Sequence, residues 1–569
     1  MKDMKKIIYA SGCLAVLFFA GCQKGDFLDK TSVSDLTEEN VFTDSARTMD
    51  FLAGIYTDIG FSFRPNRFGT GGLDAASDEA EGKSQSQGTD YVKFITGSLS
   101  SANVSVTPWS VPYTNIRRAN LFLKHIDSAP FSASQRRRAR AEARFLRAWY
   151  YSILLKHYGG VPLVGDTLYN MNDEILTKRN TYEEVVNYIV SECDAAAADL
   201  PPEHFSSDYG RITKGACMAL KSRVLLYAAS PLFNGGGLAS DAELKAVAGY
   251  PNADPERWRL AAEASKAIID AGFYQLYEDN VTAPGYGFAK VFTLRKNKEY
   301  ILAEMMPRNR YLEGLWLPPS RGNPTGAFPT QDLVDAFGMA NGLPINDPAS
   351  GYQENNPYAN RDPRLDYTVI RNESKLLLYA TSQKETVYTY AGASPDGLGG
   401  SGTPTGYYVN KMLDEEVTNS IFTTSLRCLP LIRYAEILLN FAEARNEYSG
   451  PDQDVYDAVE AIRKRAGLNP YTLPSGLSKE QMRTIIRAER RVELAFEEHR
   501  FWDVRRWLIA EEVDNRPVHG MQITRHEDDS YSYQTFVVRD RTFRRPMYLW
   551  PIPQSEIFKS TDMLQNPGW

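Results

Sequence analysis

Cysteine and histidine are scarce in this sequence. The chain of 569 residues contains 5 cysteines and 6 histidines. Beyond the amino-terminal region only Cys193, Cys217 and Cys428 remain, and an odd, widely spaced set excludes a disulfide framework. Neither residue type follows the ligand spacing of a zinc site. The sequence therefore gives no indication of a structural metal centre or of a fold held together by disulfides.

Blocks of basic residues are also missing. Lys and Arg number 64 against 71 Asp and Glu, which gives a formal net charge of −7. A polyanionic partner would need a basic patch strong enough to overcome the field of that charge. Nucleic acid is therefore excluded as a partner. Wholesale disorder is excluded too, because 43% of the residues are hydrophobic and 24% are charged.

The sequence has one extended hydrophobic run near its start, and that run is too short to span a membrane. It extends from Ile7 to Ala20, follows three lysines and ends at Gly21-Cys22. A basic start, a short apolar stretch and small residues describe an export signal. Because cysteine directly follows Ala-Gly, we predict a bacterial lipoprotein signal peptide over residues 1–21, with Cys22 as the lipid anchor. The alternative is an ordinary cleaved signal followed by a chance cysteine.

Lipidation at Cys22 would fix the mature chain to a membrane, since each buried methylene of an acyl chain contributes ~0.8 kcal/mol. Removal of residues 1–21 takes away three lysines and one aspartate, so the formal net charge falls from −7 to −9. The polar stretch that follows is expected to act as a short tether over residues 22–35.

Residues 36–569 are expected to form one domain. We predict a helical scaffold over about 36–272 and 430–510, an irregular insert over about 275–430, and a C-terminal loop segment over 511–569. The insert is rich in Pro, Gly and Asn, and GASPDGLGGSGTPTGYY (392–408) lacks any helical pattern. Loops on a rigid scaffold commonly carry recognition, so the insert is where we expect a ligand.

The scaffold regions show apolar residues at helical spacing, with caps such as Gly159-Gly160 at their ends. We expect helices at Val41–Ile59, Trp109–Ile126, Ser134–Tyr158, Thr181–Leu200, Lys214–Ala229, Pro255–Ala271, Arg433–Glu447, Asp454–Arg465 and Ser478–Leu508.

Three of these helices share one spacing of small and large apolar residues. The sets are Ala141, Phe145 and Ala148; Ala264, Ile268 and Ala271; and Ala435, Leu439 and Ala442. Small residues at these positions let helices pack closely, as in tetratricopeptide helix pairs. We therefore predict a mostly α fold: tetratricopeptide-like helix pairs (an α/α superhelix) support a large irregular, loop-rich half with few short strands.

Five stretches in the same order resemble the SusD/RagB family of outer-membrane nutrient-binding lipoproteins. They are AEARFLRAWYYSILLKHYGGVPLV (141–164), GRITKGACMALKSRVLLYAASPLFN (210–234), LIRYAEILLNFAEARNE (431–447), ERRVELAFEEHRFWDVRRW (489–507) and YLWPIPQSEIFKSTDMLQNPGW (548–569). NRDPRL (360–365) and TGYYVNK (405–411) add support inside the insert. No single motif is decisive, but together they are specific.

The resemblance implies a cell-surface protein held in the outer membrane by Cys22. Members of this family form a lid over a TonB-dependent barrel transporter of the SusC type, capture oligosaccharides and pass them inward, and they are not enzymes. The resemblance thus implies an outer-membrane, carbohydrate-binding partner in polysaccharide utilisation. The alternatives are a peptide-binding lid of a peptide importer and a surface glycoside hydrolase. Against the hydrolase, the sequence shows no nucleophile elbow and no Gly-rich phosphate loop.

The stretch ERRVELAFEEHRFWDVRRW places Glu489, Glu493 and Glu497 on one stripe of the expected helix Ser478–Leu508. Glycosidase carboxylates face each other across a sugar, whereas these would lie on consecutive turns. We therefore interpret the stripe as scaffold, with a partner surface or a catalytic site as alternatives. The expected ion pairs are Arg490–Glu493, Glu497–Arg500 and Asp503–Arg506, with Arg433, Arg463 and Arg465 supplying further charge from neighbouring helices.

A capture protein for sugars needs exposed ring faces and hydrogen-bonding groups on open loops. The candidate ligand-binding residues are Trp316, Tyr311, Arg321 and Asn323 in segment 308–324, Tyr91 and Phe94 in segment 89–97, and Tyr286 beside two glycines. For each ring the alternative is burial, because large aromatic side chains are mostly found in the core. We expect no catalytic residue, no metal ligand and no cofactor, and leave a structural calcium ion open.

Overall fold

The computed structural model describes most of the chain from Glu38 onward. The described residues are 38–68, 71–83, 88–104, 107–170, 172–175, 177–204, 206–235, 237–322, 324–378, 380–414 and 424–569. The predicted signal peptide, the anchor Cys22 and the tether of residues 22–35 lie outside these ranges, and so does Asn323.

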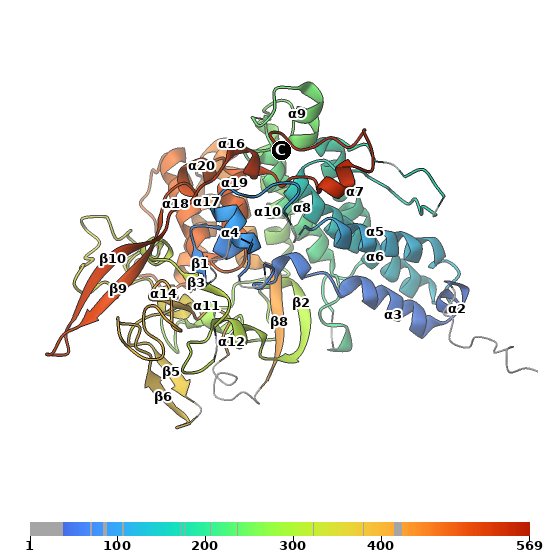
Figure 1. The fold of residues 1–569 in the computed structure, drawn as a ribbon. Helices are drawn as coiled ribbons and strands as arrows, with labels where there is room; N and C mark the ends of the chain where they lie inside the picture. The colour runs from blue at the N-terminus through green and yellow to red at the C-terminus, as the bar shows by residue number, and fades with distance from the viewer. Residues whose placement is uncertain are drawn as a thin grey trace, which may run out of the picture.

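The long helices, together with the short first helix α2, form a continuous array along one side of the molecule (Figure 1). They are α2 (Glu38–Phe42), α3 (Ser45–Tyr56), α5 (Ser110–His125), α6 (Ala133–Tyr158), α7 (Tyr182–Asp199), α8 (Lys214–Ala229), α10 (Glu256–Ala271), α16 (Tyr434–Ser449), α17 (Gln453–Arg465) and α18 (Lys479–Glu493). Helices from α5 to α8 pack in chain order, α8 packs on α10, and α10 packs on α16. The two helical blocks expected from the sequence therefore form one array across the insert.

The helices begin and end where their local chemistry predicts. Ser132 and Gln135 form a capping box at the start of α6, and Gly159 ends this helix with a φ of 79°. Ala141, Phe145 and Ala148 on α6 are buried against neighbouring helices. The prediction of a mostly α, helix-pair scaffold is confirmed.

Shorter helices occupy the loops and the irregular half. They are α4 (Asp90–Ile95), α9 (Ala242–Ala248), α11 (Tyr286–Lys290), α12 (Tyr311–Trp316), α13 (Gln331–Ala336), α14 (Arg364–Thr368), α19 (His499–Arg506), α20 (Ala510–Val513) and α21 (Gln554–Ile557). Single 3-10 turns are η1 (Phe61–Phe63), η2 (Leu73–Ala76), η3 (Ser206–Asp208) and η4 (Arg545–Tyr548).

The strands form small antiparallel pairs. They are β1 (Ala80–Gly82), β2 (Tyr300–Asn309), β3 (Ala327–Pro329), β4 (Val369–Ile370), β5 (Lys375–Leu378), β6 (Gln383–Thr386), β7 (Tyr408–Val409), β8 (Ser425–Arg433), β9 (Val518–Arg525) and β10 (Tyr531–Arg539). The pairs are β1–β3, β2–β8, β4–β7, β5–β6 and β9–β10. Most are short, as expected from the sequence, but β2–β8 and β9–β10 are longer than predicted.

The pair β2–β8 joins the two ends of the irregular insert. Tyr300 is paired with Arg433 in the register, and the backbone N–H of Tyr434 at the start of α16 donates to the Glu299 carbonyl at 2.8 Å. The insert therefore leaves the helical array and returns to it through one ribbon. Its position relative to the helices is set at this neck.

The expected helix Ser478–Leu508 is wrong as a single element. Helix α18 ends at Glu493, α19 begins at His499, and between them Phe496 and Glu498 have φ values of 59° and 60°. Residues other than glycine rarely adopt this left-handed conformation. Glu498 Oε1 accepts the backbone N–H of Leu73 at 3.3 Å, a contact between distant parts of the chain that no local pattern can reveal.

Helices and strands at the two ends of the expected scaffold also differ from the predictions. The first expected helix, Val41–Ile59, is divided into α2 and α3, and Asp44 caps the start of α3. The expected loop segment 511–569 contains the hairpin β9–β10, which projects from the molecule at the end remote from α2 and α3 (Figure 1).

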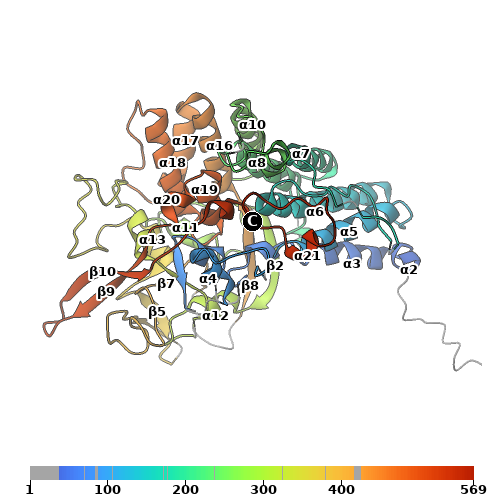
Figure 2. The same cartoon turned by 45° about the horizontal axis from the view of Figure 1, so that its top comes forward.

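The C-terminal segment runs back over the scaffold. The backbone N–H of Trp550 donates to the backbone carbonyl of His157 at 2.8 Å, and the Arg179 guanidinium donates to Asn566 Oδ1 at 2.9 Å. Figure 2 shows this end of the chain next to α6. None of the helices within the described residues is both long and apolar enough to cross a bilayer.

Candidate functional site

The acidic stripe of Glu489, Glu493 and Glu497 lies inside the protein, at the contact between the helical array and the insert. Glu493 has no exposed surface and accepts hydrogen bonds from Arg433 at 2.7 Å and from Arg364 at 3.0 Å. Arg465 on α17 donates to the same carboxylate. Arg364 belongs to the insert, so one carboxylate connects three separate segments.

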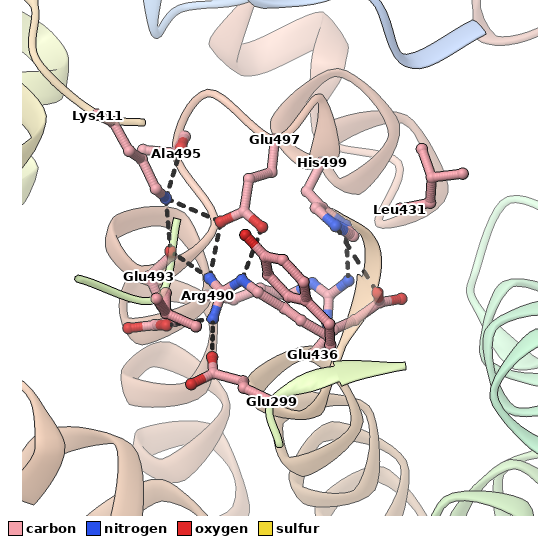
Figure 3. Close-up of polar contacts among 12 residues, drawn as sticks. Glu299, Lys411, Leu431, Glu436, Arg490, Glu493, Ala495, Glu497 and His499 are labelled. Atoms are coloured by element: carbon pink, nitrogen blue, oxygen red, sulfur yellow. Dashed lines mark hydrogen bonds and ion pairs between the residues drawn. The ribbon is translucent and has the colours of Figure 1, made fainter. Parts of the chain in front are cut away.

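Glu497 and Glu299 extend this cluster (Figure 3). Glu497 pairs with Lys411 at 2.8 Å and with Arg433 at 2.7 Å, and Glu299 pairs with Arg433 at 2.8 Å. We call Glu299, Arg364, Lys411, Arg433, Arg465, Glu489, Glu493 and Glu497 the buried ion-pair network.

The network holds Glu493 and Glu497 in the ionised state. Burial alone would raise the pKa of Glu493, but Arg465, Arg433 and Arg364 outweigh it and hold that pKa well below its usual value. Burial opposes ionisation of Glu497 in the same way, and Arg433 and Lys411 again lower the pKa. Because both carboxylates are buried and paired with cations, neither has the pKa or the open face of a general acid. The interpretation of the stripe as scaffold fits this geometry.

The ion pairs differ in part from those expected. Asp503 pairs with Arg506 at 2.9 Å as predicted, and Arg433 and Arg465 supply charge to Glu493 as predicted. Arg490, however, pairs with Asp503 at 2.8 Å rather than with Glu493. Arg500 pairs with Asp78 at 2.7 Å rather than with Glu497. The turn between α18 and α19 breaks the helical spacing on which the predicted pair Glu497–Arg500 depended. Arg490 and Glu493 both lie within α18, but Glu493 faces Arg364, Arg433 and Arg465 instead.

Three of the predicted ligand-binding rings are buried. Trp316 is 1% exposed, Tyr91 0% and Phe94 3%. Each lies on a short helix, α12 or α4, where the sequence indicated a loop, and the helix turns the ring inward. Trp316 lies 6.2 Å from Phe496, centroid to centroid. The expectation that these rings face solvent is wrong.

Arg321 has a structural position, because its side chain is 3% exposed. It donates to the carbonyl oxygens of Leu376 and Glu385 at 3.3 and 3.0 Å, and these carbonyls belong to the hairpin β5–β6. Tyr311 and Tyr286 are partly exposed. The Tyr311 hydroxyl donates to Asn66 Oδ1. Of the five predicted aromatic rings, Tyr311 and Tyr286 are therefore the two that keep some access to solvent.

The structure places a different set of aromatic side chains together on the surface of the irregular half. Tyr388 is 39% exposed and its ring centroid lies 5.6 Å from that of Tyr390. Tyr390 in turn lies 6.2 Å from Tyr531 on β10. Arg525 on β9 covers Tyr390 with its guanidinium carbon 5.8 Å from the ring centroid.

Two further tyrosines continue this surface. Tyr533 on β10 lies 5.8 Å from Tyr358, at an interplanar angle of 81°. Arg371 stacks on Tyr358 at 4.7 Å from the ring centroid and pairs with Asp366 at 2.8 Å. All five rings are exposed or partly exposed. We call Tyr358, Tyr388, Tyr390, Tyr531 and Tyr533 the tyrosine stripe.

The backbone of the hairpin brings the stripe together. The Ala391 N–H donates to the Ile523 carbonyl at 2.8 Å, so the segment carrying Tyr388 and Tyr390 runs along β9. On its other edge Ile523 pairs with Tyr533 of β10. Tyrosines from two distant segments therefore meet over one strand.

The stripe offers ring faces together with hydrogen-bonding groups. Burial raises the pKa of Tyr531 and of Tyr533, so their phenols stay protonated and can donate at neutral pH. Glu373 is exposed, and its carboxylate interacts with the Tyr531 hydroxyl. Rings for C–H contacts beside hydroxyl, guanidinium and carboxylate groups suit a ligand with an apolar ring face and a polar edge.

Sequence reasoning missed these tyrosines, although a signal is present. VYTY (387–390) and SYSY (530–533) each carry tyrosine at alternate positions, and side chains two residues apart in an extended segment share a face. The described ranges contain no group of three or more His, Cys, Asp or Glu side chains arranged to hold a metal ion.

Comparison with known proteins agrees with the fold. The model of the SusD family matches residues 290–569, and a second model, described as starch-binding associating with outer membrane, matches residues 26–226. SusD-like protein P2 of Formosa agariphila is 24% identical over 470 residues, which cover 81% of this chain and 80% of that protein.

Two solved structures from Bacteroides fragilis are similar over nearly their whole length. A SusD-like protein has a TM-score of 0.77 at 28% identity, covering 94% of this chain and 99% of the other. A SusD-like carbohydrate binding protein has a TM-score of 0.72 at 25% identity, with 92% and 100% covered. With the helix-pair array, the sequence motifs and both family models in agreement, the chain belongs to the SusD/RagB family.

Proposed function

We propose that the protein captures oligosaccharides on the tyrosine stripe at the outer surface of the cell. The observation that carries this proposal is the row of partly exposed rings beside exposed polar groups, on an open surface that a long chain can cross. The description of the second family model as starch-binding supports a carbohydrate ligand. So does the name of the carbohydrate-binding relative from Bacteroides fragilis.

We further propose that Cys22 anchors the protein in the outer membrane and that a SusC-like TonB-dependent transporter receives the captured sugar. We also propose that the protein binds without cleaving. The acids of the buried ion-pair network are held by cations and closed to substrate, which supports this for the carboxylates of the acidic stripe. Neither a cofactor nor a metal takes part, so treatment with EDTA leaves binding unchanged. Co-purification from outer-membrane extracts, with the full chain as bait, tests the transporter; recovery of no barrel protein would contradict it.

The binding test uses the full chain and a panel of soluble polysaccharides, starting with starch, in affinity electrophoresis. For any polysaccharide that retards the protein, Tyr388→Ala and Tyr531→Ala each lower the affinity. Loss of one ring contact worth about 0.5–1.5 kcal/mol corresponds to about a 2- to 13-fold change. The matched control is Tyr471→Ala, because Tyr471 is also 39% exposed but lies between α17 and α18, outside the stripe.

Two results would overturn the proposal. One is retardation that Tyr388→Ala and Tyr531→Ala leave as strong as in the parent protein. The other is an absence of binding to every polysaccharide together with saturable binding of peptides, which would favour the peptide importer. Release of new reducing ends from a bound polysaccharide would instead identify a hydrolase.

A further inference from the structure

A cavity of about 300 Å³ opens where the helical array meets the start of β2. It lies between the α7–α8 connection, the end of α10 and strand β2, and it shares no residue with the tyrosine stripe. Its lining includes Glu203, Tyr209, Phe273, Tyr274, Lys298 and Met305. This volume is at the lower end of the range for small-molecule sites. We call it the junction pocket.

Three aromatic side chains stand partly exposed in the junction pocket. Phe273 and Tyr274 lie edge to face, with centroids 6.5 Å apart and an interplanar angle of 81°. Tyr209 comes from the α7–α8 connection. The floor is apolar, made by residues of β2. A planar or chair-shaped ring of a ligand can therefore contact aromatic faces on more than one side.

Glycines keep the pocket open. Gly272 ends α10 in the left-handed conformation with a φ of 66°, and the chain turns there to present Phe273 and Tyr274. A Cβ at Gly210 would come within 2.4 Å of the Met305 side chain, and one at Gly215 within 2.2 Å of the Tyr274 hydroxyl. Side chains at these positions would displace the groups that line the cavity.

The charged side chains Glu203, Arg211 and Lys298 line the pocket, and Arg211 is neutralised by Glu142 at 2.8 Å and Asp208 at 3.3 Å. The charges that remain come from Lys298, Glu203 and the neighbouring Lys296. Lys298 pairs with Glu203 at 3.1 Å, and both side chains are about half exposed, at 54% and 48%. Lys296 places its ammonium nitrogen 5.1 Å from the centroid of Tyr209. Within the part of the chain that the structure describes, no carboxylate pairs with Lys296. Two ammonium groups against one carboxylate disfavour a cationic ligand, although aromatic rings alone would attract one.

We propose that the junction pocket binds a single sugar ring carrying a carboxylate, that is, a hexuronic acid unit. The rings supply contacts to the C–H faces of the sugar, and the lysines at the mouth attract its carboxylate. The size of the cavity selects one ring over a long chain. The inference rests on the proposed carbohydrate-binding function but concerns a second site with its own residues.

The test titrates the full chain with sodium D-glucuronate and D-galacturonate, and with D-glucose and D-galactose as neutral counterparts, by saturation-transfer NMR. At least one uronate binds about 2- to 5-fold more tightly than its neutral counterpart, as expected for a partly exposed charge contact. Lys298→Gln lowers the uronate affinity by a similar factor. Glu203→Gln raises the uronate affinity, because that change removes the carboxylate that pairs with Lys298.

Because Lys298→Gln and Glu203→Gln change the uronate affinity in opposite directions, a specific charge effect can be distinguished from a general loss of structure. Thermal melting checks that both variants fold. Phe273→Ala weakens uronate and neutral sugar alike. Failure of both uronates to bind, equal affinity for the neutral sugars, or the same response to Lys298→Gln and Glu203→Gln would overturn the inference. The two sites share no residue, so their failures can be told apart. A parent protein that is retarded by polysaccharide but binds no uronate refutes this inference alone, and one that binds uronate but is retarded by no polysaccharide refutes the tyrosine stripe alone.

Discussion

Replacing Glu493 by Gln tests whether the buried ion-pair network is structural. The substitution keeps the shape of the side chain but removes a charge that contacts Arg364 at 3.0 Å, Arg433 at 2.7 Å and also Arg465. Removing one partner of a buried pair costs about 3–5 kcal/mol, because the remaining charges lose their compensation. We expect a loss of that size in the free energy of unfolding.

The expected change in melting temperature follows from the size of the chain. With an unfolding entropy of about 2.1 cal/mol/K per residue, 569 residues give about 1.2 kcal/mol/K. A loss of about 3–5 kcal/mol then lowers the melting temperature by about 2.5–4 °C. Differential scanning calorimetry at pH 7 measures this shift, and polysaccharide retardation at 20 °C should stay at the parent level.

The matched control is Glu512→Gln. Glu512 is 68% exposed and pairs with Arg516 at 2.6 Å on the surface, where such a pair is worth about 0–1 kcal/mol. The melting temperature of Glu512→Gln should stay within about 1 °C of that of the parent protein. Melting of Glu493→Gln at the parent temperature, or loss of retardation without loss of stability, would refute the structural interpretation.

Acid should remove the difference between the parent and Glu493→Gln. Burial opposes ionisation of Glu493, but the arginines prevail and lower its pKa in the folded state. The stabilisation is therefore complete above the unfolded pKa of about 4.3 and is lost as the pH falls below that value. The difference in melting temperature between the parent and Glu493→Gln should have its largest value at pH 7 and decrease progressively below about pH 4.

Two further substitutions extend these predictions. Trp316→Ala should lower the free energy of unfolding by about 3–5 kcal/mol in denaturant titrations while leaving retardation by polysaccharide unchanged, because the ring is buried; reduced binding by a fully folded variant would restore it as a ligand contact. Burial and Asp74 raise the pKa of Glu498 to about 8, so the contribution of Glu498 to stability is lost as the pH rises from about 4.3 to about 8. Glu498→Gln should therefore melt at a higher temperature than the parent at pH 8.5, but close to the parent at pH 4. Equal melting temperatures of the two proteins at both pH values would contradict the raised pKa.

The helical scaffold could be predicted from the sequence because its signals are local. The Ser132 cap, the apolar spacing of α6 and the Gly159 terminus lie within one continuous stretch, and α8 runs over Lys214–Ala229 as expected. The break after Glu493 could not be predicted, because helical spacing continues through it. It depends on Glu498 contacting Leu73, more than four hundred positions earlier.

The candidate site was less predictable than the scaffold, for the same physical reason. Exposure of a ring depends on which neighbours cover it: Phe496 covers Trp316, whereas Tyr388 has 39% of its surface open. Tyr390 and Tyr531 meet only because β9 lies between their segments. The alternating tyrosines indicated extended segments with an aromatic face, but pairing between distant segments decided that the faces would adjoin.

The buried ion-pair network also determines how this protein can be divided. Arg364 and Lys411 come from the insert, while Glu493 and Arg465 come from the scaffold. Cutting the polypeptide at the neck would separate Arg364 and Lys411 from the glutamates Glu493 and Glu497, so neither piece is expected to be a self-sufficient folding unit. The hairpin β9–β10 and its tyrosines contribute no member to this network, so they can be altered without removing any of its ion pairs.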